Sequence, residues 1–155
     1  MMSSAFVREP EGGEAFEDLP DRPVSPHHLV TPSGLARMDE EIAALKRRLA
    51  EAQASNDKAE VARVSRDLRY WNHRRLTAEM VPPPSDKSHV RFGSSVSFER
   101  TDGRIQTYRI VGEDEADPAN GSISYVSPLA QALMGKEIGD VVIVPQGEAE
   151  IVGIR

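Results

Sequence analysis

The fold is decided by residues 35–80, which read LARMDEEIAALKRRLAEAQASNDKAEVARVSRDLRYWNHRRLTAEM. Apolar residues recur there in steps of three and four, the spacing of the buried seam of a coiled coil. In the first half these residues are Leu35, Met38, Ile42, Leu45, Leu49 and Ala52, and in the second half they are Val61, Val64, Leu68 and Trp71. Two matching seams, joined by a polar turn at residues 55–58, predict an antiparallel helical hairpin.

Both ends of the hairpin carry boundary signals. Thr31 can cap the first helix, and Pro32 occupies the first helical position, where the N–H that proline lacks has no helical partner. Three consecutive prolines at residues 82–84 cannot continue a helix. We therefore expect a coiled-coil hairpin over residues 31–81 and a linker over residues 82–89.

Residues 1–30 show neither a helical nor a strand period. They contain four prolines, a pair of adjacent glycines, and six acidic against two basic side chains. This composition predicts a mostly disordered acidic arm. Its apolar residues Phe6, Phe16 and Leu19 could dock on a partner or on the folded part of the chain.

The pattern changes to a period of two from residue 90 onward, which is typical of strands. Apolar residues alternate with polar ones around residues 96–98, a turn follows at residues 101–104, and further strands are expected at residues 105–111, 123–126, 140–144 and 148–154. Ser127 can cap a short helix with Pro128 at its first position, and Gly135 ends that helix. The sequence thus predicts a small α+β domain over residues 90–155.

Composition narrows the function classes. The chain has 155 residues, a net charge of −6 and no cysteine, so disulfides are absent and a reducing compartment is expected. Residues 31–80 carry ten basic and eight acidic side chains, too weak an excess for a free-standing nucleic-acid binder. There is no apolar run long enough for a membrane span and no secretory signal. There is also no catalytic triad, phosphate loop or zinc spacing, so a self-contained enzyme is not expected.

The order of a helical hairpin and then these strands resembles the Gre family of bacterial transcription elongation factors. The resemblance covers roughly residues 30–155 and rests on VTPSGL (residues 30–35), QTYRIVG (106–112), EDEAD (113–117), ISYVSPLAQALMGKE (123–137) and GDVV (139–142). It implies an FKBP-like C-terminal domain. The expected fold class is therefore α+β, with an antiparallel helical hairpin, shorter than is usual in the family, followed by a small FKBP-like antiparallel-sheet domain with one short helix.

The resemblance also implies a function. Such a factor binds RNA polymerase at the rim of its secondary channel, inserts the hairpin, and modulates elongation, pausing or cleavage of the backtracked transcript. The polymerase contact would run through Val126, Ser127, Pro128 and Leu129; Val126 stands where the family often has a polar or acidic residue. Helix capping alone also explains Ser127 and Pro128.

Asp57 and Glu60 match the two acids, separated by two residues, that family members carry at the hairpin turn. Two carboxylates on one turn could hold a Mg²⁺ ion shared with RNA polymerase, which would activate water for phosphodiester hydrolysis. The alternative is an ordinary solvated turn. In either case the resemblance implies a cytoplasmic monomer with no cofactor or catalytic residues of its own, no membrane contact, and at most indirect contact with the nascent RNA.

Two other function classes stay open on the sequence alone. An FKBP-like peptidyl-prolyl isomerase would need an apolar pocket lined by aromatic side chains, here drawn from Phe92, Phe98, Tyr108 and Tyr125. A non-catalytic coiled-coil adaptor would instead dimerise through the apolar seam of the hairpin.

Overall fold

The computed structural model describes residues 19–23 and 28–155, and the chain divides into two compact units. The hairpin unit contains Arg37–Thr77 together with the described residues 19–23. The sheet unit contains residues 28–36 and Ala78–Arg155. The hairpin is therefore an insertion, because the chain leaves the sheet unit at residue 36 and re-enters it at residue 78.

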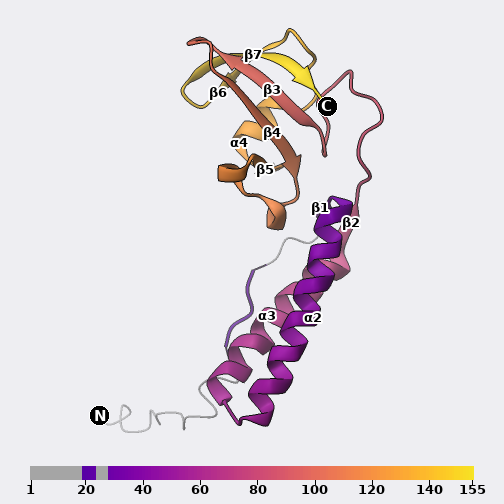
Figure 1. Cartoon of the computed structure of the whole chain (residues 1–155), viewed down its shortest axis with the longest axis vertical. Coiled ribbons are helices and arrows are strands. Elements are labelled where there is room, and N and C mark those ends of the chain that lie inside the picture. Colours follow the sequence, from indigo (N-terminus) through magenta and orange to yellow (C-terminus); the bar gives the residue numbers. More distant parts are fainter. Residues whose placement is uncertain (1–18, 24–27) are drawn as a thin grey trace, which may run out of the picture. The chain divides into compact units, whose positions relative to one another are not determined.

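The two predicted helices are α2 (Pro32–Ala54) and α3 (Lys58–Thr77), which pair antiparallel (Figure 1). Twenty-three residues give α2 a length of about 35 Å from the rise per residue of an α-helix. The seam is buried as the periodicity indicates: Ile42 and Leu45 pack against Val64 and Leu68, with Trp71 partly buried beside them. Within the described ranges, no helix is long and apolar enough to cross a membrane.

Two short strands hold together the two ends of the inserted hairpin. Strand β1 (His28–Val30) pairs in parallel with β2 (Ala78–Met80), and the Val81 N–H donates to the Val30 carbonyl at 2.9 Å. The sequence predicts the end of a mostly disordered arm at the first of these segments and the helical hairpin at the second; both predictions are wrong, because the two segments are paired strands. Helix α3 ends at Thr77 because the next residues, Ala78–Met80, form backbone hydrogen bonds with strand β1. Val81 cannot resume the helix, because a residue that precedes a proline disfavours helical backbone angles.

The remainder of the predicted arm, residues 1–18 and 24–27, lies outside the described residues. The predicted linker, residues 82–89, contains no helix or strand and belongs to the sheet unit.

A five-stranded sheet forms the body of the sheet unit. Its order is β5-β4-β3-β7-β6, and every pair is antiparallel except β4–β5, which is parallel. The strands are β3 (Ser95–Arg100), β4 (Ile105–Val111), β5 (Ser122–Ser124), β6 (Val141–Val144) and β7 (Gly147–Ile154). The predicted fold class, a helical hairpin followed by a small sheet domain with one short α-helix, is thus confirmed.

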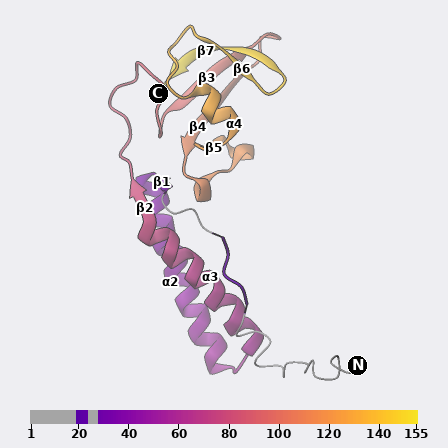
Figure 2. The ribbon, with the colours of Figure 1, turned by 180° about the vertical axis from the view of Figure 1, so that it is seen from behind.

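One short helix, α4 (Pro128–Leu133), packs against the sheet (Figure 2). Phe98, Ile110, Leu133 and Ile151 are completely buried in the core between them. The loop predicted between β4 and β5 contains two 3₁₀ helices, η2 (Glu113–Glu115) and η3 (Pro118–Asn120). The sheet unit therefore presents two connections of interest, η2 after β4 and the turn between β5 and α4.

Candidate functional site

The turn between α2 and α3 is tight and capped. Asn56 adopts a left-handed backbone conformation with φ +56°, which asparagine tolerates better than most residues. The Asp57 N–H donates to the Ala52 carbonyl at 2.9 Å, and the Glu60 N–H donates to Asp57 Oδ1 at 3.1 Å. Asp57 is therefore the N-cap of α3, and one of its carboxylate oxygens is occupied by the helix backbone.

Glu60, one turn into α3, is held by two arginines. Arg48 of α2 donates from Nη2 to Glu60 Oε1 at 2.8 Å, and Arg63 donates from Nη2 to Oε2 at 3.3 Å. The hydrogen bonds from Arg63 and then from Arg48 lower the pKa of Glu60. The pair with Arg48 joins the two helices close to the turn.

The tip carboxylates, in this arrangement, do not fit a divalent cation. Three of their four oxygens already accept hydrogen bonds, one from the α3 backbone and two from guanidinium groups. A cation that takes oxygen ligands from both side chains would have to displace the arginines from Glu60, and on Asp57 only the oxygen not used by the α3 cap would be available. Among the described residues, no group of three or more histidine, cysteine, aspartate or glutamate side chains is placed to hold a metal ion.

Replacing Asp57 with alanine is expected to destabilise the hairpin unit by about 1 kcal/mol, the usual loss for an N-cap. Asparagine at the same position should retain most of the stability, because its side-chain oxygen can still accept from the Glu60 N–H. Urea unfolding followed by far-UV circular dichroism measures both variants. Equal losses for Asp57→Ala and Asp57→Asn would show that charge, and not the cap, is the contribution of Asp57.

The Glu60 ion pairs should make hairpin stability depend on pH. Because the folded-state pKa lies below the ordinary value of 4.5, the stabilisation is fully present above that value and is lost as the pH falls through the lowered pKa. We expect the urea midpoint of the wild-type chain to approach that of Glu60→Gln as the solution is acidified. A difference between the two midpoints that stays constant with pH would contradict this assignment.

The second candidate region is the turn between β5 and α4. Ser127 caps α4, because its Oγ accepts from the Ala130 N–H at 3.2 Å. Val126 precedes it with 51% of its surface exposed, while Leu129 packs against the core. Of the predicted contact residues, Val126 and Pro128 thus face solvent, and Ser127 and Leu129 fix the turn that presents them.

One functional candidate was missed by sequence analysis: Glu115, at the end of η2. Its carboxylate accepts from the backbone N–H groups of Thr31 and Gly112, each at 3.0 Å, and from the Thr31 hydroxyl. The same hydroxyl accepts from the Gly34 N–H at 3.0 Å, so the predicted cap on α2 is present. Glu115 therefore ties the first turn of α2 to the sheet, although the two segments lie 84 residues apart in sequence.

Two glycines make this contact sterically feasible. A Cβ atom at Gly34 would lie 2.2 Å from the Glu115 carboxyl carbon, and one at Gly112 would lie 2.6 Å from the Leu29 carbonyl oxygen. Both distances are far shorter than any carbon contact allows. We call Thr31, Gly34, Gly112 and Glu115 the Glu115 anchor.

The anchor is linked to the turn that carries Val126. The Leu29 N–H, in β1, donates to the hydroxyl of Tyr125 at 3.2 Å, and Tyr125 directly precedes Val126. The Tyr125 carbonyl also accepts from Gln131 Nε2 at 2.6 Å, which braces the start of α4. The position of Val126 and Pro128 is therefore set by contacts from β1 as well as from α4.

The aromatic residues that an isomerase pocket would need lie in the core. Phe98 is completely buried, Phe92 is 6% exposed, and Tyr108 and Tyr125 pack against the same cluster. A groove on the sheet unit at β3, β6 and β7 is lined mainly by charged and small residues, among them Glu99, Arg100 and Glu150. The seam that an adaptor would use for dimerisation is buried within the hairpin itself.

Comparison with known proteins gives matches to one family model and to relatives that cover up to 81% of the chain. The family model described as "Transcription elongation factor, GreA/GreB, C-term" matches residues 85–155. Transcription elongation factor GreB of Pseudomonas aeruginosa is 36% identical over 141 residues, covering 77% of this chain and 84% of that protein. Transcription elongation factor GreA of Cereibacter sphaeroides is 35% identical over 150 residues, covering 81% of this chain and 96% of that protein.

Other matches are more local or more distant. Transcription elongation factor GreA of Desulfovibrio desulfuricans is 51% identical over 70 residues, but this match spans only 43% of the relative's length. Among solved structures, the GreA factor homolog 1 (Gfh1) protein of Thermus thermophilus is 22% identical, with a TM-score of 0.41, and covers 83% of this chain and 99% of that one.

Proposed function

Because the chain belongs to the GreA/GreB family of transcription elongation factors, we propose that it binds RNA polymerase at the secondary channel and modulates elongation and pausing. The observation that carries this proposal is the similarity to GreA and GreB over most of the chain, hairpin included. The protein would act as a monomer in the bacterial cytoplasm, and any contact with the nascent RNA would be indirect.

The sheet unit would bind the polymerase. Its turn between β5 and α4 offers the exposed side chains of Val126 and Pro128 on a backbone that Ser127 and Tyr125 hold in place. A preformed turn of this kind loses little conformational freedom on binding. The contact would therefore be an apolar one centred on Val126.

The hairpin would enter the channel without bringing a metal ion. The carboxylates of Asp57 and Glu60 are committed to the helix cap and to the arginine pairs, which favours pausing or altered elongation over transcript cleavage. Any phosphodiester hydrolysis in the complex would then be chemistry of the polymerase itself. The chain would have no catalytic activity of its own.

Purified bacterial RNA polymerase and an affinity-tagged full-length chain test the binding step. We expect the tagged chain to retain the polymerase, and failure to retain it would refute the proposal. Addition to elongation complexes should change pause lifetimes, and addition to backtracked complexes should leave the basal rate of transcript cleavage unchanged.

A matched variant separates the roles of the tip acids. Asp57→Asn/Glu60→Gln keeps the size of both side chains and an acceptor for the α3 cap, yet removes both charges. We expect this variant to alter pausing as the wild-type chain does. Stimulated cleavage by the wild-type chain, lost in the double variant, would instead show that the tip carboxylates take a metal ion inside the polymerase.

A further inference from the structure

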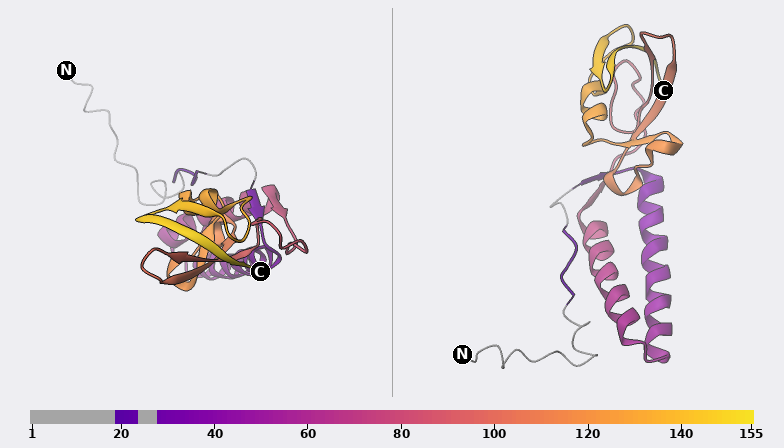
Figure 3. Two further views of the ribbon diagram at one scale, coloured as in Figure 1. Left: turned by 90° about the horizontal axis from the view of Figure 1, so that it is seen from above. Right: turned by 90° about the vertical axis from the view of Figure 1, so that its left-hand side faces the viewer.

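Strand β6 forms one edge of the five-stranded sheet, and within the described residues it pairs with β7 alone (Figures 1 and 3). Successive residues of an antiparallel strand point their backbone groups alternately toward the partner strand and away from it. Asp140, directly before β6, faces β7, because its carbonyl accepts from the Ile151 N–H at 2.9 Å. Val141 and Ile143 therefore direct their N–H and C=O groups to the open edge.

The same two residues carry exposed apolar side chains. Ile143 is 78% exposed, and Val141 is 61% exposed. Natural edge strands are usually protected by charged side chains, by proline or by a covering segment, whereas β6 consists of three valines and one isoleucine. Apolar side chains beside outward-directed backbone groups form a template on which an extended peptide can add a strand.

Glutamates lie on the same face of the sheet, directly behind β6. On β7, Glu150 lies opposite Val141. Glu148 lies opposite Ile143 in the same pairing, and Glu99 of β3 lies opposite Glu150. Residues opposite each other in an antiparallel pair share a face, and like charges in that arrangement repel each other. The two apolar side chains of β6 are therefore bordered by acidic charge.

A neighbouring arginine is engaged elsewhere. Arg100 lines the same groove as the three glutamates. Its Nε donates to Gln106 Oε1 at 2.6 Å, and its Nη1 donates to the Pro145 carbonyl at 2.7 Å. A cation supplied from outside the chain would therefore complement the charge of this face.

We propose that β6 binds an extended segment of a partner protein as a sixth strand, and that lysine or arginine occupies alternate positions of this segment. The backbone groups of Val141 and Ile143 would bond to the segment, and the aliphatic stems of its cations would cover their side chains. Strands lie about 4.8 Å apart, so the added strand would run about 10 Å from β7. A long cation from one side and Glu148 or Glu150 from the other together span that distance.

Charge and area favour this occupant over a second copy of the chain. A second copy would offer no cation from its own β6, and each chain carries a net charge of −6. Two edges of four residues each would also bury less than roughly 1,200 Å², the lower end for stable interfaces. The proposal is independent of polymerase binding, which is proposed above at the turn that carries Val126.

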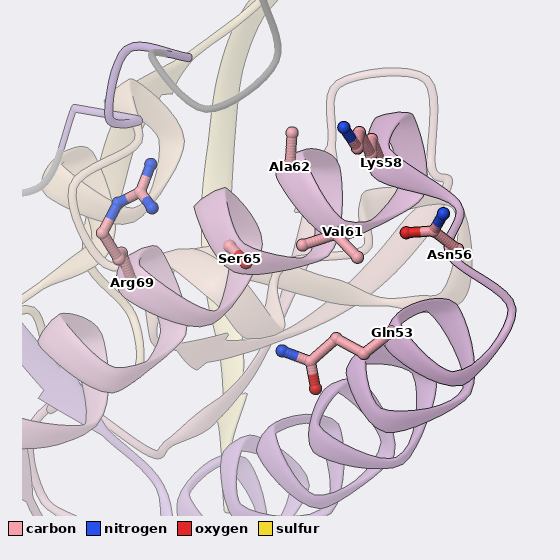
Figure 4. Close-up of a pocket in the computed structure, with 7 residues that line it drawn as sticks. All are labelled: Gln53, Asn56, Lys58, Val61, Ala62, Ser65 and Arg69. Carbon is pink, nitrogen blue, oxygen red and sulfur yellow. The ribbon is translucent and has the colours of Figure 1, made fainter. Parts of the chain in front are cut away.

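The hairpin unit offers a groove of the opposite charge, which serves as an internal reference. Its volume is about 400 Å³, and Lys58 and Arg69 line it together with Val61 and Ala62 of α3 (Figure 4). Cations at this groove repel a basic segment. The amides of Val61 and Ala62 should therefore not respond to a peptide that binds β6.

The end-capped peptide KTKTKTK, in which lysine alternates with threonine, is the probe. It is titrated into the isotope-labelled full-length chain while the backbone amides are followed by NMR. We expect shift changes at Val141 and Ile143, and their amide hydrogen exchange should slow by about tenfold or more at saturation, because both N–H groups become hydrogen-bonded. The peptide KKKKTTT, with the same composition but no alternation, should bind several-fold more weakly.

Variants separate charge from main-chain pairing. Glu148→Lys/Glu150→Lys should weaken binding of KTKTKTK by about tenfold, the loss of two partly exposed ion pairs. Glu40→Lys/Glu41→Lys makes the same charge change on the exposed surface of α2 and should leave binding nearly unchanged. Ile143→Pro removes a donor that faces away from β7, so the sheet can accept it, and binding should weaken several-fold. N-methylation of the lysine amides of the peptide removes the same bonds without altering the chain.

Three results would overturn the proposal. Equal affinities for the wild type and Glu148→Lys/Glu150→Lys would remove the charge complementarity. Unchanged exchange at Val141 and Ile143 in the saturated complex would show that the peptide lies on the face without adding a strand. Shift changes of these two amides on dilution of the chain alone would show that a second copy occupies the edge.

Discussion

Replacing Gly34 with alanine is expected to destabilise the sheet unit, although alanine is the better helix former. A Cβ atom at this position cannot coexist with the Glu115 carboxylate, which must move and give up its bonds to Thr31 and Gly112. Losing charge-assisted hydrogen bonds to partly buried backbone groups outweighs the helix-propensity gain of about 1 kcal/mol, so we expect a net loss of about 2 kcal/mol.

A double-mutant cycle makes this prediction specific. Glu115→Ala alone should also destabilise the sheet unit, because the N–H groups of Thr31 and Gly112 lose their acceptor. In that background the steric conflict is gone, and Gly34→Ala should become stabilising by about 1 kcal/mol. Urea unfolding of all four chains measures the cycle. Simple additivity of the two single effects would mean that the anchor does not act as one unit.

Replacing Val126 with lysine is expected to weaken binding to RNA polymerase by about tenfold or more, with little change in the stability of the free chain. The side chain is 51% exposed, so the free protein tolerates the change. Lysine would place a strongly hydrated cation in the proposed apolar contact. Equilibrium binding of labelled chain to polymerase measures the loss.

A matched control and a second variant sharpen this test. Ile105→Lys introduces the same cation at another exposed apolar position of the sheet unit and should leave polymerase binding unchanged. Val126→Asp distinguishes the type of contact, because it should strengthen binding if the polymerase presents a cation and weaken it if the contact is apolar. Equal affinities for wild type and Val126→Lys would remove this turn from the interface.

Periodicity explains what could be predicted from the sequence. The seam of the hairpin repeats over many turns, and four of the five strands of the larger sheet are four to eight residues long, so both leave a clear pattern. Strands β1 and β2 have only three residues each and pair across an inserted hairpin, and no period can build up over that length. The sequence therefore predicts the end of an arm at β1 and the end of the helical hairpin at β2.

The roles of the candidate site residues could not be predicted from the sequence for a different reason. An acid followed by another acid three residues later suits a metal-binding pair, but it is also the spacing of a helix cap, and only the contacts of Asp57 and Glu60 distinguish the two. Glu115 stands among several acids after β4, and its partners Thr31 and Gly34 lie more than 80 residues away. No local signal separates it from its exposed neighbours.

The parallel pairing of β1 with β2 has a consequence for how such factors diversify. Both ends of the inserted segment are fixed side by side, so the chain between them can grow or shrink by matched heptads in each arm without altering the domain that receives it. The length of the hairpin can therefore change without changing the surface of the sheet unit. Chains with longer or shorter hairpins could then share one sheet unit.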